Sequence, residues 1–188
     1  MDLKSTIDLF DEYYRHEDEN TNFNRDVASE ARKRLVQLDG ILRRIIALEK
    51  EGGTIQLPLG MHQKGDDEAV DKSIYRKIEI EDELEFLTEA FYYFAFRLRR
   101  IVRGLSGLNA FECKGVRDVR NKLIEHPEGR DSEVYIVSFG YGGEQGPMIK
   151  ALRYECQTEV FKDAGLFANA TELKDNLEKR LSEYLKDS

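Results

Sequence analysis

Apolar side chains recur at spacings of three and four residues in four long stretches of the chain, which is the pattern of amphipathic helices. The pattern predicts helices over residues 2–15, 24–50, 71–103 and 169–185. Asn24 is a suitable N-cap for the second of these helices, and Asn169 or Thr171 for the last. The glycine pair at 52–53 is expected to end the second helix, because glycine weakens helices.

The third predicted helix carries aromatic residues on most of its faces between Phe86 and Phe96. A helix that is apolar nearly all round is buried between neighbours or lies in an oligomer interface. We expect these aromatic side chains to serve the core first, and a platform for stacking nucleic-acid bases is the alternative.

A long connection is expected between the second and third helices, at about residues 52–68, because several glycines and Pro58 fall there. Loops of this length are often functional. Met61 and His62 are therefore candidates to line a site.

The chain changes character after residue 127, where β-branched and aromatic residues over 134–139 predict a strand. Residues 148–154 are expected to pair with it, which gives a β-hairpin at about 133–154. Its glycine-rich tip is not a phosphate-binding loop, because no Gly-Lys-Ser/Thr follows. The sequence thus predicts one mainly α domain over residues 1–188, an up-and-down helical bundle with an appended β-hairpin.

Composition limits the chemistry that the chain can carry. Cys113 and Cys156 are isolated and the three histidines are scattered, so neither a metal site nor a cofactor is expected. The N-terminal residues lack the basic and apolar regions of a secretory signal, and no uncharged apolar run approaches the length of a membrane span. We therefore expect a cytoplasmic protein with no membrane partner.

Charge is distributed unevenly along the chain. The net charge of −8 argues weakly against a nucleic-acid partner. Residues 97–120, however, contain seven basic and only two acidic residues, a net charge of +5, which leaves −13 for the rest. A local basic region of this kind is what phosphate binding requires, although the same arginines could instead pair with acidic neighbours.

The basic region ends in a short helical pattern over residues 115–126. Val116, Val119 and Leu123 share one face and are expected to enter the core. Pro127 disfavours the α conformation in the residue before it, so the helix should end at about residue 125 or 126.

Arg120, Asn121 and, after four further residues, His126 resemble the motif of the HEPN superfamily (higher eukaryotes and prokaryotes nucleotide-binding), many of whose members are metal-independent ribonucleases. The resemblance covers this motif and the helical pattern around it. It implies a HEPN-like bundle and a homodimer in which Arg and His of both copies line a cleft. It also implies RNA products with a 2′,3′-cyclic phosphate, and a toxin or antiviral defence effector that an antitoxin or other partner protein could accompany.

The side chains of the motif suit this chemistry. Histidine can act as base or acid near neutral pH, and a helix C-terminus favours its charged form, so His126 is the expected catalytic acid or base. Arg120 offers a planar fork for phosphate oxygens, and Asn121 could hold the histidine or a phosphate oxygen. Contacts to RNA are assigned to four further cations: Arg100, Arg103, Lys114 and Arg117.

Two other interpretations stay open. Arg120 could pair with Glu125 or another carboxylate while His126 caps the helix, so that both residues serve structure alone. The chain could also be a non-catalytic helical module that binds a protein or RNA, because members of one fold do not all share an activity.

Overall fold

A computed structural model describes the backbone of residues 2–17, 23–55, 67–123, 132–137, 148–153 and 158–187. Side chains are described for residues 2–17, 23–55, 71–120 and 165–186. The expected sites at Met61, His62 and His126 lie outside the described residues.

Helices dominate the described part of the chain, as the sequence predicts. Their bounds are α1 Lys4–Glu17, α2 Arg25–Thr54, α3 Asp67–Val102, α4 Lys114–Leu123 and α5 Leu166–Asp187. Asn24 caps α2 as expected, because its Oδ1 accepts the backbone N–H of Val27 at 3.1 Å.

Three helix ends differ from the prediction. Helix α3 begins at Asp67, four residues before its predicted start at 71. Helix α2 continues through Gly52 and Gly53 to Thr54. A Cβ at Gly52 would lie 3.5 Å from Ile80 of α3, so the helix is held there by packing on its neighbour. Helix α5 begins at Leu166, so Asn169 and Thr171 lie inside it and are not caps. The sequence interpretation missed this because it did not assign the strand that leads into α5.

The strands form one antiparallel sheet in the order β1-β2-β3. They span β1 Ser132–Val137, β2 Met148–Arg153 and β3 Thr158–Gly165. The sequence interpretation expected a two-stranded hairpin. The structure has a third strand, β3, which pairs with β2 and runs directly into α5. Residues 158–165 show no clean alternation of apolar and polar side chains, which is why no strand was predicted there.

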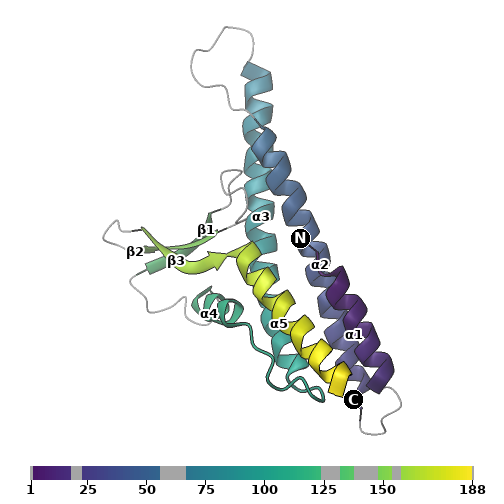
Figure 1. Ribbon diagram of the computed structural model, residues 1–188. Helices are drawn as coiled ribbons and strands as arrows, with labels where there is room; N and C mark the ends of the chain where they lie inside the picture. The colour runs from purple at the N-terminus through teal and green to yellow at the C-terminus, as the bar shows by residue number, and fades with distance from the viewer. Residues whose placement is uncertain are drawn as a thin grey trace.

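The helices pack as a bundle, which Figure 1 shows with the sheet to one side of α3. The most extensive packing between helices is that of α2 on α3. Helix α1 packs on α2 and α5, and α4 packs on α3. Large aromatic side chains fill the core, among them Phe10, Tyr13, Phe91, Tyr92 and Phe111. None of the helices described is both long and apolar enough to cross a membrane.

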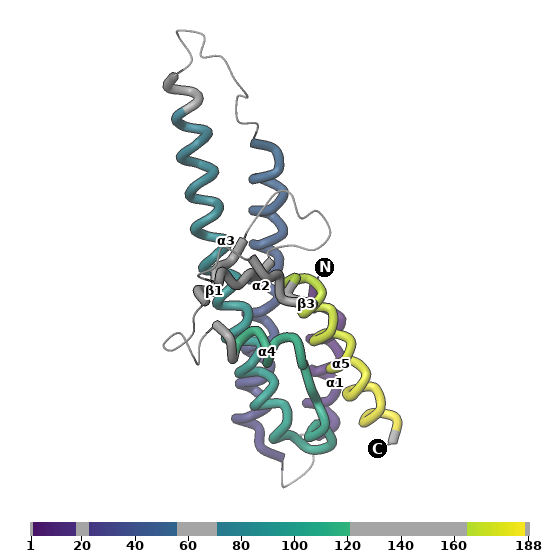
Figure 2. The backbone as a smooth tube through the Cα atoms, turned by 90° about the vertical axis from the view of Figure 1, so that its left-hand side faces the viewer, coloured from purple at the N-terminus to yellow at the C-terminus, as the bar shows by residue number. Residues whose placement is uncertain are grey.

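The C-terminal end of α2 and the N-terminal end of α3 project from the bundle side by side (Figures 1 and 2). We call this pair of helix ends the arm. The backbone N–H of Leu3 donates to Asp39 at 2.8 Å, so α1 begins level with the middle of α2 and does not cover the rest of it. Within the arm, an ion pair of 2.6 Å between Arg44 and Glu83 and the buried side chains of Ile80 and Leu84 join the two helices.

Candidate functional site

A hollow of about 450 Å³ lies on the surface between α3 and α4. Its lining is Tyr93, Phe96, Arg97, Arg100, Ile101 and Arg120. Half of these six residues are arginines and none is acidic. We call it the arginine hollow. The combination of fixed positive charge with aromatic rings suits a ligand that carries both a phosphate and a planar base.

Arg120 forms the α4 side of the arginine hollow. Its guanidinium carbon lies 4.4 Å from the centre of the Phe96 ring on α3, within the range of a cation–π contact. The adjoining face of α4 carries Val116 and Val119 into the core, as the sequence predicts. The burial of these valines therefore fixes the rotation of α4 that turns Arg120 toward α3.

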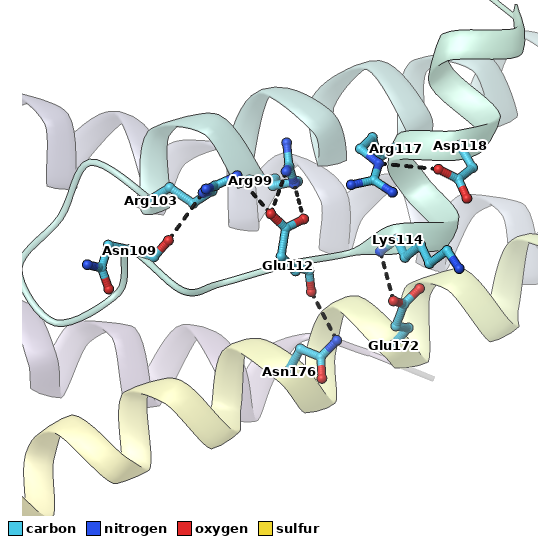
Figure 3. Close-up of polar contacts among 9 residues, drawn as sticks. All are labelled: Arg99, Arg103, Asn109, Glu112, Lys114, Arg117, Asp118, Glu172 and Asn176. Carbon is cyan, nitrogen blue, oxygen red and sulfur yellow. Dashed lines mark hydrogen bonds and ion pairs between the residues drawn. The ribbon is translucent and has the colours of Figure 1, made fainter.

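A second cluster, shown in Figure 3, holds other arginines of the basic region. The carboxylate of Glu112 accepts two hydrogen bonds from Arg99, at 2.8 and 2.6 Å, and one from Arg103 at 2.7 Å. Arg103 also donates to the carbonyl of Asn109 at 3.2 Å. Arg103 was expected to contact RNA. Its side chain remains 44% exposed, and it shares the single negative charge of Glu112 with Arg99.

The other two expected RNA contacts on α4 differ in their surroundings. The Arg117 guanidinium lies 3.2 Å from the carboxylate of Asp118. The Lys114 side chain is exposed, whereas its backbone N–H donates to Glu172 of α5 at 2.8 Å. Of the four assigned cations, the described structure therefore places only Arg100 in the arginine hollow with Arg120.

The start of α4 is fixed by α5. Glu172 accepts the N–H groups of Lys114 and Gly115, at 2.8 and 3.1 Å, which satisfies two of the donors left open at a helix N-terminus. A Cβ at Gly115 would overlap with Oδ1 of Asn169. Asn169 is itself held by its hydrogen bond of 2.8 Å to the buried Tyr92 hydroxyl. These contacts set where α4, and with it Arg120, lies against the bundle.

The structure does not describe the side chains of the other two motif residues, Asn121 and His126. Asn121 belongs to α4, but its side chain lies outside the described residues, as does all of His126. Their proximity to Arg120 stays a prediction from the sequence.

Of the residues that α3 contributes to this site, sequence reasoning assigned only Arg100 to RNA. Tyr93 and Phe96 were treated as core residues first, with base stacking as the alternative, and Arg97 was counted in the basic region without a role. The signal was present, because Tyr93, Arg97 and Arg100 recur at helical spacing on one polar face. The buried core of α3 is made by residues on the opposite side, including Phe91, Ala95 and Leu98.

Neither a reactive cysteine nor a metal centre is found among the described residues. Burial of Cys113 raises the pKa of its thiol well above the usual range, so this cysteine is an inert part of the core. In the same part of the chain, no group of His, Cys, Asp and Glu side chains is arranged to hold a metal ion.

Comparisons with protein-family models, with curated proteins and with solved structures give no match to this chain. The resemblance to the HEPN superfamily therefore stays a prediction from the motif residues Arg120, Asn121 and His126.

Proposed function

We propose that the chain is a metal-independent endoribonuclease of HEPN type. The observation that carries the proposal is the position of Arg120, on the wall of a hollow that also contains two other arginines and two aromatic rings. The arginine of the motif therefore lies on a part of the described surface where a phosphate and a base could be held together.

The proposed chemistry divides between these groups. Arg120, with Arg97 and Arg100, would hold the scissile phosphate and stabilise the charge that develops on it. Tyr93 or Phe96 would stack on a neighbouring base. His126 would take the proton of the ribose 2′-hydroxyl or give one to the leaving oxygen, and the need for a 2′-hydroxyl restricts the substrate to RNA.

The same proposal includes the finer features that the resemblance implies. These are a HEPN-like arrangement of the bundle, a homodimer, and a role as a toxin or defence effector with an antitoxin or other partner protein. They are supported by the motif and by the helical bundle. The cytoplasmic location, which we also propose, comes from the sequence pattern and not from the resemblance.

Cleavage of total tRNA and of a mixed single-stranded RNA, in EDTA and at low salt, tests the proposal. We expect cleavage by the wild type and complete loss in Arg120→Ala and His126→Ala. Arg43→Ala and His16→Ala are matched controls, because both side chains are exposed on the bundle away from the arginine hollow. Activity that persists in His126→Ala would refute the assignment.

The rival function is a binding module without catalysis. The exposed aromatic side chains of α3 favour it, because solvent-exposed Phe and Tyr often mark a binding surface. RNA retention that weakens with salt and with Arg120→Ala, without cleavage by any variant, would indicate RNA binding alone. Absence of both RNA binding and cleavage in folded protein would leave a protein-binding module.

A further inference from the structure

One side of α3 is exposed along most of its length. Its residues are Glu79, Asp82, Phe86, Tyr93, Arg97 and Arg100, and we call this surface the α3 face. Phe86 is 68% and Tyr93 46% exposed. The residues recur at spacings of three, four and seven, as in the seam of a coiled coil. The α3 face therefore has the periodicity of a helix that packs on another helix.

The α3 face changes charge from one end to the other. Its N-terminal end on the arm is acidic, with Glu79 and Asp82, and its C-terminal end is basic, with Arg97 and Arg100. Its middle has an aromatic side chain on either side of the exposed Glu89. The two charged ends are complementary to each other when the face is turned end to end. An exposed apolar patch with a polar rim is typical of an interaction site.

We propose that the α3 face binds the α3 face of a second copy of the chain, antiparallel and around a two-fold axis that passes near Glu89. This register brings Phe86 level with Tyr93 of the other copy, and Asp82 level with Arg97. Because the axis makes the surface isologous, each of these contacts forms twice. Antiparallel packing also sets the acidic arm of each copy against the basic end of the other.

The groups at both ends of the α3 face remain accessible to a partner. The Arg97 guanidinium lies 4.0 Å from Glu30 of its own chain, and the side chain is 50% exposed. Glu79 pairs with Arg76 at 3.0 Å and is 66% exposed. Such exposed pairs contribute little to stability, so exchange for a partner in the second copy costs little.

The arginine hollow lies at the basic end of the α3 face, and its lining matches what the second copy delivers. Residues 78–86 of the other arm would lie over it. Phe86 faces the aromatic side of the hollow, Asp82 faces its arginines, and Ile78, itself 47% exposed, reaches the level of Ile101. At these three levels apolar groups meet apolar groups and carboxylates meet guanidinium groups, whereas Glu89 lies beside its own counterpart at the axis.

The arrangement has a consequence that rests on the proposed function. Arg97 and Arg100 cannot hold the carboxylates of a second copy and the phosphates of RNA at the same time. The carboxylates of the acidic arm would occupy these arginines in place of RNA phosphates. A polyanion that binds the arginines would therefore separate the two copies. This dimer differs from the cleft implied by the HEPN resemblance, because acidic residues, and not a second Arg and His, lie across the two-fold axis from the arginines.

Sedimentation velocity of the full chain over a wide concentration range tests the proposal. We expect a dimer whose dissociation constant rises with salt. Asp82→Arg and Arg97→Asp each place like charges together twice, so each should weaken the dimer roughly tenfold. The double variant Asp82→Arg/Arg97→Asp restores opposite charges and should return the dissociation constant to within a few-fold of wild type. A monomer at every concentration, or a double variant weaker than either single one, would overturn the inference.

Matched controls and a polyanion complete the experiment. Asp8→Arg and Arg15→Asp make the same substitutions at exposed positions of α1, and should leave the dimer unchanged. Inorganic polyphosphate should shift wild type toward monomer, and a dimer that polyphosphate leaves intact overturns the competition. Dimer formation is measured without RNA, so its failure is separate from a failure of the ribonuclease assay.

Discussion

Replacing Glu112 by glutamine tests whether the ion-pair cluster of Figure 3 holds the segment that leads into α4. The substitution Glu112→Gln preserves size but removes the charge that Arg99 and Arg103 share. Arg99 is the critical partner, because its side chain is only 10% exposed and water cannot easily replace the lost carboxylate. The amide that replaces the carboxylate would offer one acceptor oxygen in place of two.

The expected cost follows from these contacts. A hydrogen bond to a charged group contributes roughly 1.5–3 kcal/mol net when it is buried. The Glu112 carboxylate accepts three such bonds, but its side chain is 44% exposed and solvent screens them. We therefore expect the free energy of unfolding to fall by about 2 kcal/mol in total, and Tm by about 4–8 °C in a chain of this length.

Urea unfolding followed by circular dichroism measures the change, and a double-mutant cycle with Arg99→Met assigns it to the pair. The hydrogen bond from Arg99 lowers the pKa of Glu112 from its ordinary value of 4.5. The stabilisation is therefore present above pH 4.5 and is lost as pH falls through the lowered pKa. A loss below about 0.5 kcal/mol at pH 7, or full additivity of the two substitutions, would refute the reasoning.

Two further predictions concern stability. Gly115→Ala should lower the free energy of unfolding by about 1–3 kcal/mol, because its new Cβ would overlap with Asn169; urea unfolding checks this, and Gly40→Ala, with nothing within 4 Å, is the control that should show no loss. Burial raises the pKa of the Glu49 carboxyl from 4.5 to about 7. Below pH 4.5 the carboxyl is neutral in both states and does not reduce the free energy of unfolding. As pH rises through 7 this stability is lost, because the unfolded chain ionises the carboxyl more readily than the folded chain does. Glu49→Gln should match wild type at pH 4 and exceed its free energy of unfolding at pH 8 by about 1 kcal/mol, a value reduced because the group is only partly buried; equal stability at both pH values would contradict it.

The helices could be predicted from the sequence because a helix that buries one face in a bundle has apolar residues at spacings of three and four. Val116 and Val119 are buried as their spacing indicates, and Asn24 caps α2. Strand β3 could not be predicted, since its place in the sheet depends on pairing with β2 and not on a local pattern. The glycines at 52–53 led to a wrong prediction of the end of α2 for a related reason. Glycine disfavours a helix by about 1 kcal/mol per residue, but contact with α3 outweighs this local preference.

The site was predicted from α4 and from Arg100 of α3. Arg120 was found because the motif is contiguous in sequence. Phe96 and Arg97 join it through packing between helices, which no local pattern records. Arg103 was assigned to RNA, but in the structure it donates a hydrogen bond to Glu112. The sequence alone does not show that these two side chains meet.

The contacts between Glu172 and the first turn of α4 also bear on how this chain could vary. They join two points 57 and 58 residues apart, so the α4 and α5 ends of the intervening segment, which we call the excursion, are held together in the bundle. The entropy of closing such a loop grows only slowly with its length, by roughly 0.6 kcal/mol per doubling. Insertions or deletions within the excursion would thus leave the position of Arg120 unchanged, and this is where we expect related chains to differ most in length.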